Sequence, residues 1–289
     1  MAIARWSLLV LLLTACTTDD GFGEVRDRSY DADDSSGVTL AELTGGFTLH
    51  LGDDSDATRL SGSILGGSFS SAPLWVLSRK QNGCLLNMAR STCEPACASA
   101  EICSEELECL PLPKVMNIGK VAVGGLTSAV TLSSSKGRYA FPSGTALANP
   151  PCRAGEPITL SADGGPFRAF ALESACIDPL NFHGDIEVVR RAPLVVTWEK
   201  GVSGARVQLE IDSDLAAAQR ARIFCDVADS GTLTVDGDML ELLFKLGVSG
   251  TPTMTMTRIL SGGSVGSEPS QVSFSVEQSV TRAFSIPGY

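Results

Sequence analysis

The sequence lacks an apolar run long enough to cross a membrane. Its apolar stretch near the N-terminus, Trp6 to Leu13, is much shorter than the about 20 residues that a transmembrane helix needs. Positive charge is scarce as well, because 22 Lys and Arg stand against 33 Asp and Glu and give a net charge of -11. An acidic chain is repelled by nucleic acid, so nucleic-acid binding is not expected.

Familiar catalytic and metal-binding patterns are missing too. The chain has no P-loop, no H-E-x-x-H motif and no EF-hand spacing, and it contains only two histidines, His50 and His183. Gly262–Gly266 fits G-x-S-x-G, but that motif needs a strand-to-helix turn with an Asp and then a His later in the chain. No histidine follows Ser264, and a strand-like segment comes next. We therefore expect a loop serine, and no catalytic residue, metal or cofactor.

Two weaker patterns leave alternatives open. Glu210 and Asp212 share one face of a predicted strand, and a carboxylate pair could serve a glycoside hydrolase, although solvated surface acids explain them adequately. Trp75 alternates with apolar neighbours and is predicted to point outward, where it would be one candidate platform for a glycan. Trp198 lies on the apolar side of its strand and is expected in the core.

The N-terminus carries the most specific pattern in the chain. A basic residue, Arg5, precedes the short apolar run, and Leu13-Thr14-Ala15 leads to Cys16, which is typical of a secretory signal peptide over residues 1–15. The cysteine at this place resembles the lipobox of bacterial lipoproteins, and the resemblance implies that Cys16 is lipidated. Position 17 is Thr and not Asp, which in the same resemblance implies delivery to the outer membrane.

The next segment is predicted to be a flexible tether. Residues 16–37 contain many acids and few apolar side chains, so they cannot bury enough surface to offset the entropy of ordering. The β region is expected from residue 38 to residue 289, with a Cys-rich insert at about 84–113.

The remaining cysteines predict a disulfide framework. The chain has nine cysteines, and removing the lipidated one leaves an even number, as an exported protein with four bridges requires. They are Cys84, Cys93, Cys97, Cys103, Cys109, Cys152, Cys176 and Cys225. Five lie in the insert and three beyond it, and because both groups are odd, at least one bridge must join them.

The favoured pairing is one of about 105 connectivities. It joins Cys93 to Cys103 and Cys97 to Cys109 in a small knob, Cys84 to Cys152, and Cys176 to Cys225. A zinc site is the alternative, because Cys93 and Cys97 have the close spacing of a ligand pair. No second pair of that kind follows, and export favours disulfides.

Short alternating segments dominate the rest of the chain. Residues 207–211, 223–227 and 272–276 place apolar and polar side chains in strict alternation, which predicts strands with one buried face. Turn residues separate them, and no strand–helix rhythm occurs. The fold class is therefore all-β, an antiparallel β-sandwich (Ig-like or jelly-roll-like) with a disulfide-rich knob. One short helix is expected at 238–246, with Asp238 as its N-cap, Glu241 as capping-box partner and Gly247 after its end.

Three segments resemble uncharacterised, Cys-rich exported lipoproteins of delta-class Gram-negative bacteria: residues 117–126, 195–198 and 223–231. The resemblance implies a β-sandwich and no established activity. The leading hypothesis is a non-catalytic binding or scaffolding protein, lipid-anchored in the cell envelope at the outer membrane, with a glycan or an envelope protein as its partner. A carbohydrate-binding module is the alternative, and a carboxylate-dependent glycoside hydrolase is the second alternative.

Overall fold

A computed structural model of the protein describes residues 37–52, 58–67, 75–89, 93–104, 107–141, 147–182, 186–212, 220–247 and 253–284. The expected signal peptide, Cys16 and the tether up to residue 36 lie outside these ranges. The described elements are almost all strands. In chain order they are η1 (Leu40–Glu42), β1 (Leu43–His50), β2 (Arg59–Gly66), β3 (Trp75–Gln81), β4 (Cys84–Ala89), β5 (Glu101–Cys103), β6 (Cys109–Pro111), β7 (Lys114–Met116), β8 (Val121–Gly124), β9 (Val130–Leu132), β10 (Arg138–Ala140), β11 (Pro157–Ala162), β12 (Phe170–Ala175), β13 (Leu194–Thr197), β14 (Arg206–Asp212), β15 (Ala221–Ala228), β16 (Thr232–Val235), α1 (Gly237–Lys245), β17 (Thr253–Ser264) and β18 (Gln271–Ala283).

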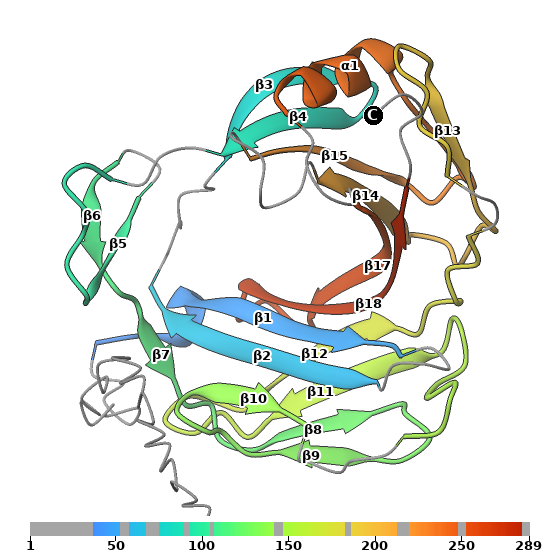
Figure 1. The fold of residues 1–289 in the computed structure, drawn as a ribbon. Helices are drawn as coiled ribbons and strands as arrows, with labels where there is room; N and C mark the ends of the chain where they lie inside the picture. Colours follow the sequence, from blue (N-terminus) through green and yellow to red (C-terminus); the bar gives the residue numbers. More distant parts are fainter. Residues whose placement is uncertain are drawn as a thin grey trace, which may run out of the picture. The chain divides into compact units, whose positions relative to one another are not determined.

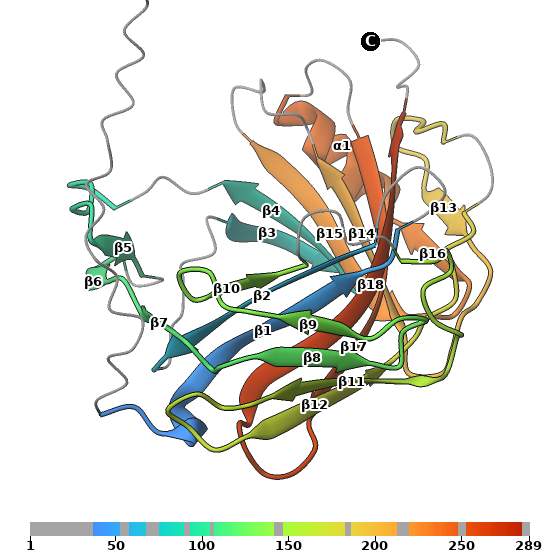
Figure 2. The ribbon, with the colours of Figure 1, turned by 90° about the horizontal axis from the view of Figure 1, so that it is seen from below.

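Most of these strands belong to one branched sheet. Its main path is β10-β2-β1-β18-β17-β12-β11-β8-β9; β14, β15, β4 and β3 branch from β17, and β7 pairs with β2 (Figure 1). The predicted all-β sandwich with one short helix and a disulfide-rich segment is confirmed. Among the described strands, one pairing departs from a wholly antiparallel fold: β1 and β18 run parallel, as Figure 2 also shows. Alternation predicts which face is buried but not strand direction, so this pairing could not be foreseen.

The buried side chains form two hydrophobic cores. The first contains Phe47 of β1, Leu160 of β11 and Phe274 of β18. The second contains Leu209 of β14 and Phe244 of α1. The long strands β17 and β18 contribute to both, because β17 pairs with β14 near its start and with β12 at its end. One pair of strands therefore links the two cores.

Two polar residues, Arg258 of β17 and Gln278 of β18, mark the boundary between the two cores. On β18, Val276 belongs to the first core and Val280 packs against the second, while Gln278 lies between them. Arg258 of β17 is the register partner of Gln278, and its side chain is fully buried. Residues two apart on a strand share a face, so these polar groups interrupt a row that is otherwise apolar.

Tyr139 is the main polar group of the first core. Its hydroxyl accepts a hydrogen bond from Ile118 N at 2.9 Å and donates toward the Gly119 carbonyl at 3.1 Å. Its ring centroid lies 5.6 Å from that of Phe47. Gly62 makes this packing possible, because a Cβ at that position would stand 2.2 Å from the Phe47 ring. Burial of Tyr139 raises the pKa of its phenol above the ordinary value of 10.0.

The helix lies close to its predicted place but has a different cap. Asp236 is the N-cap, and its carboxylate accepts hydrogen bonds from the backbone nitrogens of Asp238 and Met239. The prediction of Asp238 as N-cap was therefore wrong, because two acids two residues apart satisfy the same sequence pattern. Glu241 is not a capping-box partner either, since it is buried and its carboxylate pairs with Arg190 at 3.2 Å. The apolar side chains of Leu240, Leu243 and Phe244 are buried.

The structure contains four disulfides. Cys93–Cys103 and Cys97–Cys109 close the hairpin of β5 and β6, as predicted. The other two predicted pairs were wrong, because Cys84 bonds to Cys225 and Cys152 bonds to Cys176. The first of these joins the insert group to the downstream group, as the parity of the two groups required.

The local strand geometry explains both corrections. Cys84 lies in β4, directly opposite Cys225 on the neighbouring strand β15. Cys152 precedes β11 and Cys176 follows β12, so antiparallel pairing of these two strands brings the two cysteines together. The Cys-rich hairpin thus begins after β4 and stands apart from the large sheet, and β7 connects it back to β2 (Figures 1 and 2).

Candidate functional site

Trp75, the predicted glycan platform, begins the strand β3 and is half-buried. Its ring is contacted by two cations: the guanidinium carbon of Arg222 lies 4.3 Å from the ring centroid, and that of Arg220 lies 5.3 Å away. Cation–π contacts of this kind occupy the ring faces on which a sugar would stack. The geometry therefore gives Trp75 a packing role on the outer face of β15.

The predicted carboxylate pair belongs to the same network. Glu210 accepts a hydrogen bond from Arg222 at 2.9 Å, and Asp212 pairs with Arg220 at 3.3 Å. Each acid is thus held by its own arginine across the β14–β15 pair. Glycosidase chemistry requires two carboxyl groups that are free to flank the scissile bond, whereas each of these carboxylates is engaged by a guanidinium group. This pair is better described as a surface ion-pair ladder.

Ser264 and the histidines are not brought together. Ser264 ends β17, and its hydroxyl donates to the Glu268 carbonyl at 2.8 Å. His50 lies on the outer face of β1, where its Nδ1 is 3.7 Å from a carboxylate oxygen of Glu277. His183 lies outside the described residues. The serine is therefore placed in a strand followed by a turn, and not at the strand-to-helix elbow that a nucleophile needs.

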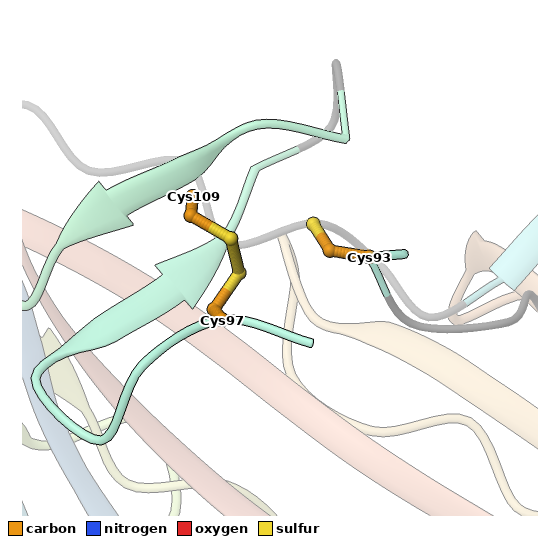
Figure 3. A group of neighbouring side chains, drawn as sticks. All are labelled: Cys93, Cys97 and Cys109. Atoms are coloured by element: carbon orange, nitrogen blue, oxygen red, sulfur yellow. A yellow bond between two sulfur atoms is a disulfide. The ribbon is translucent and has the colours of Figure 1, made fainter. Parts of the chain in front are cut away.

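The cysteine cluster is the one group of potential metal ligands found within the described ranges. The sulfur atoms of Cys93, Cys97 and Cys109 all lie within 4.8 Å of one another. Figure 3 shows the bond between the Cys97 and Cys109 sulfurs with the Cys93 sulfur beside it. Metal binding requires thiolates, and all three sulfurs are consumed in disulfides. The oxidised hairpin is a structural element, as the sequence favoured.

A buried ion pair connects the two cores. Arg258 and Asp229 are 0% and 5% exposed, and the guanidinium Nε donates to the carboxylate at 2.9 Å. The same carboxylate accepts hydrogen bonds from Trp198 Nε1 at 2.6 Å and from Gly201 N at 3.0 Å. Trp198 is buried, as predicted. Sequence reasoning missed this cluster, although an arginine at a core position of an alternating strand was a signal for a buried partner.

The ion pair and Gln278 together hold one irregular segment against the sheet. Arg258 Nη1 donates to the carbonyls of Asp178 and Pro179, at 3.0 Å and 2.7 Å. Gln278 accepts a hydrogen bond from Leu180 N at 2.6 Å through its amide oxygen. Residues 178–180 have no strand partner of their own, so these polar side chains satisfy their backbone. The segment is thereby fixed across the boundary between the cores.

A cavity of about 980 Å³ opens beside this segment. We call it the junction pocket, and it lies between the 149–154 loop, the 177–182 segment and the inner face of β18. It touches both cores, because Ile177 belongs to the first and Leu180 to the second. The Cys152–Cys176 disulfide joins two parts of its wall. Its volume falls at the upper end of the range of about 300–1,000 Å³ that is usual for small-molecule sites.

The pocket wall combines apolar and polar groups. The apolar part includes Leu126, Pro151, Ile177, Leu180, Phe182 and Val280. The polar part includes Asn149, Arg153, Glu156, Asn181, Gln278 and Arg282. Apolar walls with a few placed polar groups are typical of ligand pockets. No sequence pattern indicated this site, because its residues come from five separate segments of the chain.

Comparisons with known proteins add no function. No protein-family model matches the chain, and a search of curated proteins found no match. Within the ranges that the structure covers, no helix is long and apolar enough to span a membrane.

Proposed function

We propose that this chain is a lipid-anchored protein of the cell envelope that binds a small ligand in the junction pocket without transforming it. The observation that carries the binding role is the pocket itself, a cavity of about 980 Å³ whose walls combine apolar side chains with polar and charged ones. Cavities of this composition, where two packing units meet, are the usual places for small-molecule binding.

The envelope part of the proposal rests on two independent features. The sequence before Cys16 has the layout of a signal peptide and resembles a lipobox. Four disulfides are typical of chains that mature in an oxidising compartment. Delivery to the outer membrane, by the resemblance at Thr17, is part of the same proposal.

The non-catalytic part rests on the partners of the candidate catalytic groups. Ser264 donates to a backbone carbonyl, and Glu210 and Asp212 are each paired with an arginine. A glycan-binding role through Trp75 receives less support, because guanidinium groups contact its ring. Ligand binding at the junction pocket depends on none of these residues.

The test fills the pocket and measures binding of a neutral, polarity-sensitive naphthalene dye. Ala154 lines the pocket, so Ala154→Phe should reduce dye binding about tenfold or more by occupying ligand volume. The matched control is Ala122→Phe, which adds the same ring to an exposed position of β8. The full-length oxidised protein is embedded in lipid nanodiscs, and empty nanodiscs supply the blank. Equal dye binding by the wild type and Ala154→Phe would refute the pocket as a binding site.

A further inference from the structure

The described wall of the junction pocket is more basic than the chain as a whole. The chain has a net charge of -11, yet Arg153 and Arg282 line the pocket with Glu156 as the only acid among its lining residues. Arg153 and Glu156 neutralise each other in an ion pair at 3.1 Å. Arg282 has no carboxylate within ion-pair distance in the described part of the chain, and its Nη1 donates to the Thr281 carbonyl at 3.2 Å. The guanidinium charge of Arg282 is therefore available to bind an anion in the pocket.

Gln278 supplies a second hydrogen-bond donor in the same wall. Its side chain is 7% exposed, and its amide oxygen is engaged by Leu180 N. No described residue accepts a hydrogen bond from the amide nitrogen, and this nitrogen is not fully enclosed, because Arg222 Nε is the fully buried side-chain polar atom without a partner in the described part of the chain. Gln278 lines the pocket, so its amide nitrogen can donate to a ligand oxygen in the cavity.

The strand β18 sets the distance between these two groups. Gln278, Val280 and Arg282 alternate onto one face, so they form a row with an apolar residue in the middle. At about 3.3 Å per residue, the backbone positions of Gln278 and Arg282 are about 13 Å apart. Leu180 and Phe182 add apolar surface to the same cavity. The row thus presents a donor, an apolar stretch and a cation in this order.

We infer that the junction pocket takes an amphipathic carboxylate with an acceptor oxygen at its far end. Arg282 would bind the carboxylate, for which a guanidinium is suited by charge and by geometry. The apolar body would lie along Val280 and Leu180, and Gln278 would donate to the distal oxygen. This inference rests on the proposed function and names the ligand class of the same site.

The test uses four probes of matched chain length on the full-length oxidised protein in nanodiscs, with empty nanodiscs as the blank. The probes are decanoate, decanoate with a keto group at its penultimate carbon, decanol and decyltrimethylammonium. Calorimetry should rank the keto acid first, decanoate second, decanol third and the cation last. Arg282→Ala should weaken both acids about tenfold and leave decanol unchanged. The control Arg168→Ala removes an exposed arginine outside the pocket and should change nothing.

A second variant isolates Gln278 without releasing the 178–180 segment. Gln278→Glu keeps an oxygen that can accept from Leu180 N but removes the amide donor. The wild type should prefer the keto acid over decanoate about twofold to tenfold, and this ratio should fall to about one in the variant. A ratio that is unchanged in Gln278→Glu would overturn the role of Gln278.

The outcomes separate this inference from the proposed function. If the naphthalene dye binds in a way that Ala154→Phe abolishes, but decanol or the cation binds as well as decanoate, the ligand class is wrong and the pocket remains a binding site. The same holds if neither acid binds. If the dye and all four probes bind the wild type and Ala154→Phe alike, both the function and the ligand class are refuted.

Discussion

The buried ion pair between Arg258 and Asp229 gives the sharpest prediction about stability. Asp229→Ala would leave the fully buried guanidinium with only backbone carbonyls as partners. It would also remove the acceptor of Trp198 Nε1 and of Gly201 N. Breaking one side of a buried pair costs about 3–5 kcal/mol, because an uncompensated charge stays in the interior. We expect Asp229→Ala to lower the free energy of unfolding by an amount in this range.

The coupling between the two residues can be measured by a double-mutant cycle. Arg258→Met removes the charge but keeps most of the side-chain volume, and by itself it leaves Asp229 buried and unpaired. In the double variant neither charge remains, so its loss of stability should be smaller than the sum of the single losses by about 1–3 kcal/mol. Asp229→Asn retains an acceptor for the Trp198 indole, so it should lower the free energy of unfolding less than Asp229→Ala does.

The assay is equilibrium unfolding in urea with all disulfides oxidised. The exposed pair Arg206–Asp226, whose atoms lie 2.7 Å apart, serves as the control. Solvent screens such a pair, so Arg206→Met should cost less than about 1 kcal/mol. The reasoning is refuted if Asp229→Ala loses no more stability than the control Arg206→Met. It is also refuted if the stability losses of Asp229→Ala and Arg258→Met add up to that of the double variant.

Three further predictions concern other parts of the fold. Tyr139→Phe should destabilise the protein by about 1–3 kcal/mol in urea, because it leaves a buried backbone N–H without an acceptor. In the wild type the pKa of Tyr139 is raised, so the contribution of its phenol to the free energy of unfolding is complete below about pH 10 and is lost as the pH rises further. Alkaline unfolding monitored by phenolate absorbance would detect this loss. Asp236→Ala should cost about 1 kcal/mol in thermal unfolding while Asp238→Ala costs little, and the reverse order would contradict the observed cap. Replacing Cys84 and Cys225 by Ser should cost up to about 5 kcal/mol on the chain-entropy account, since the bridge closes a loop over a separation of 141 residues; a loss below 1 kcal/mol would contradict this.

Much of the fold could be predicted because alternation reports burial directly. The strict alternation of residues 207–211 and 223–227 predicted β14 and β15, and their inward side chains are buried. The parity of the cysteines predicted one long-range bridge. The local pattern also predicted both bridges of the hairpin, where the cysteines are close in sequence.

The features that the sequence did not predict share one physical cause. Strand order and direction decide which distant residues meet, and alternation contains neither. The parallel pairing of β1 with β18 and the contact of Cys84 with Cys225 are both of this kind. Asp229 and Arg258 are likewise joined only by the arrangement of their strands, and the sequence showed a turn and an isolated arginine.

The candidate site was hidden for the same reason. Trp75 was singled out because an outward aromatic is visible in one strand, whereas the arginines that contact it come from β15 and the residue before it. The junction pocket is lined by five segments that are far apart in the sequence, and no local pattern connects them. Gln278 was detectable in principle, as a polar residue in a row of apolar ones on β18.

The most direct test of a lipid-anchored, oxidised β protein is mass spectrometry of the chain extracted from its own membrane. The account predicts a mature protein that begins at Cys16, carries acyl chains on it and gains eight hydrogens when reduced, which is two for each of four disulfides. Proteolysis without reduction should release a Cys84 peptide linked to a Cys225 peptide. A chain with an intact N-terminus and free thiols, or a Cys84 peptide linked to Cys152, would contradict it.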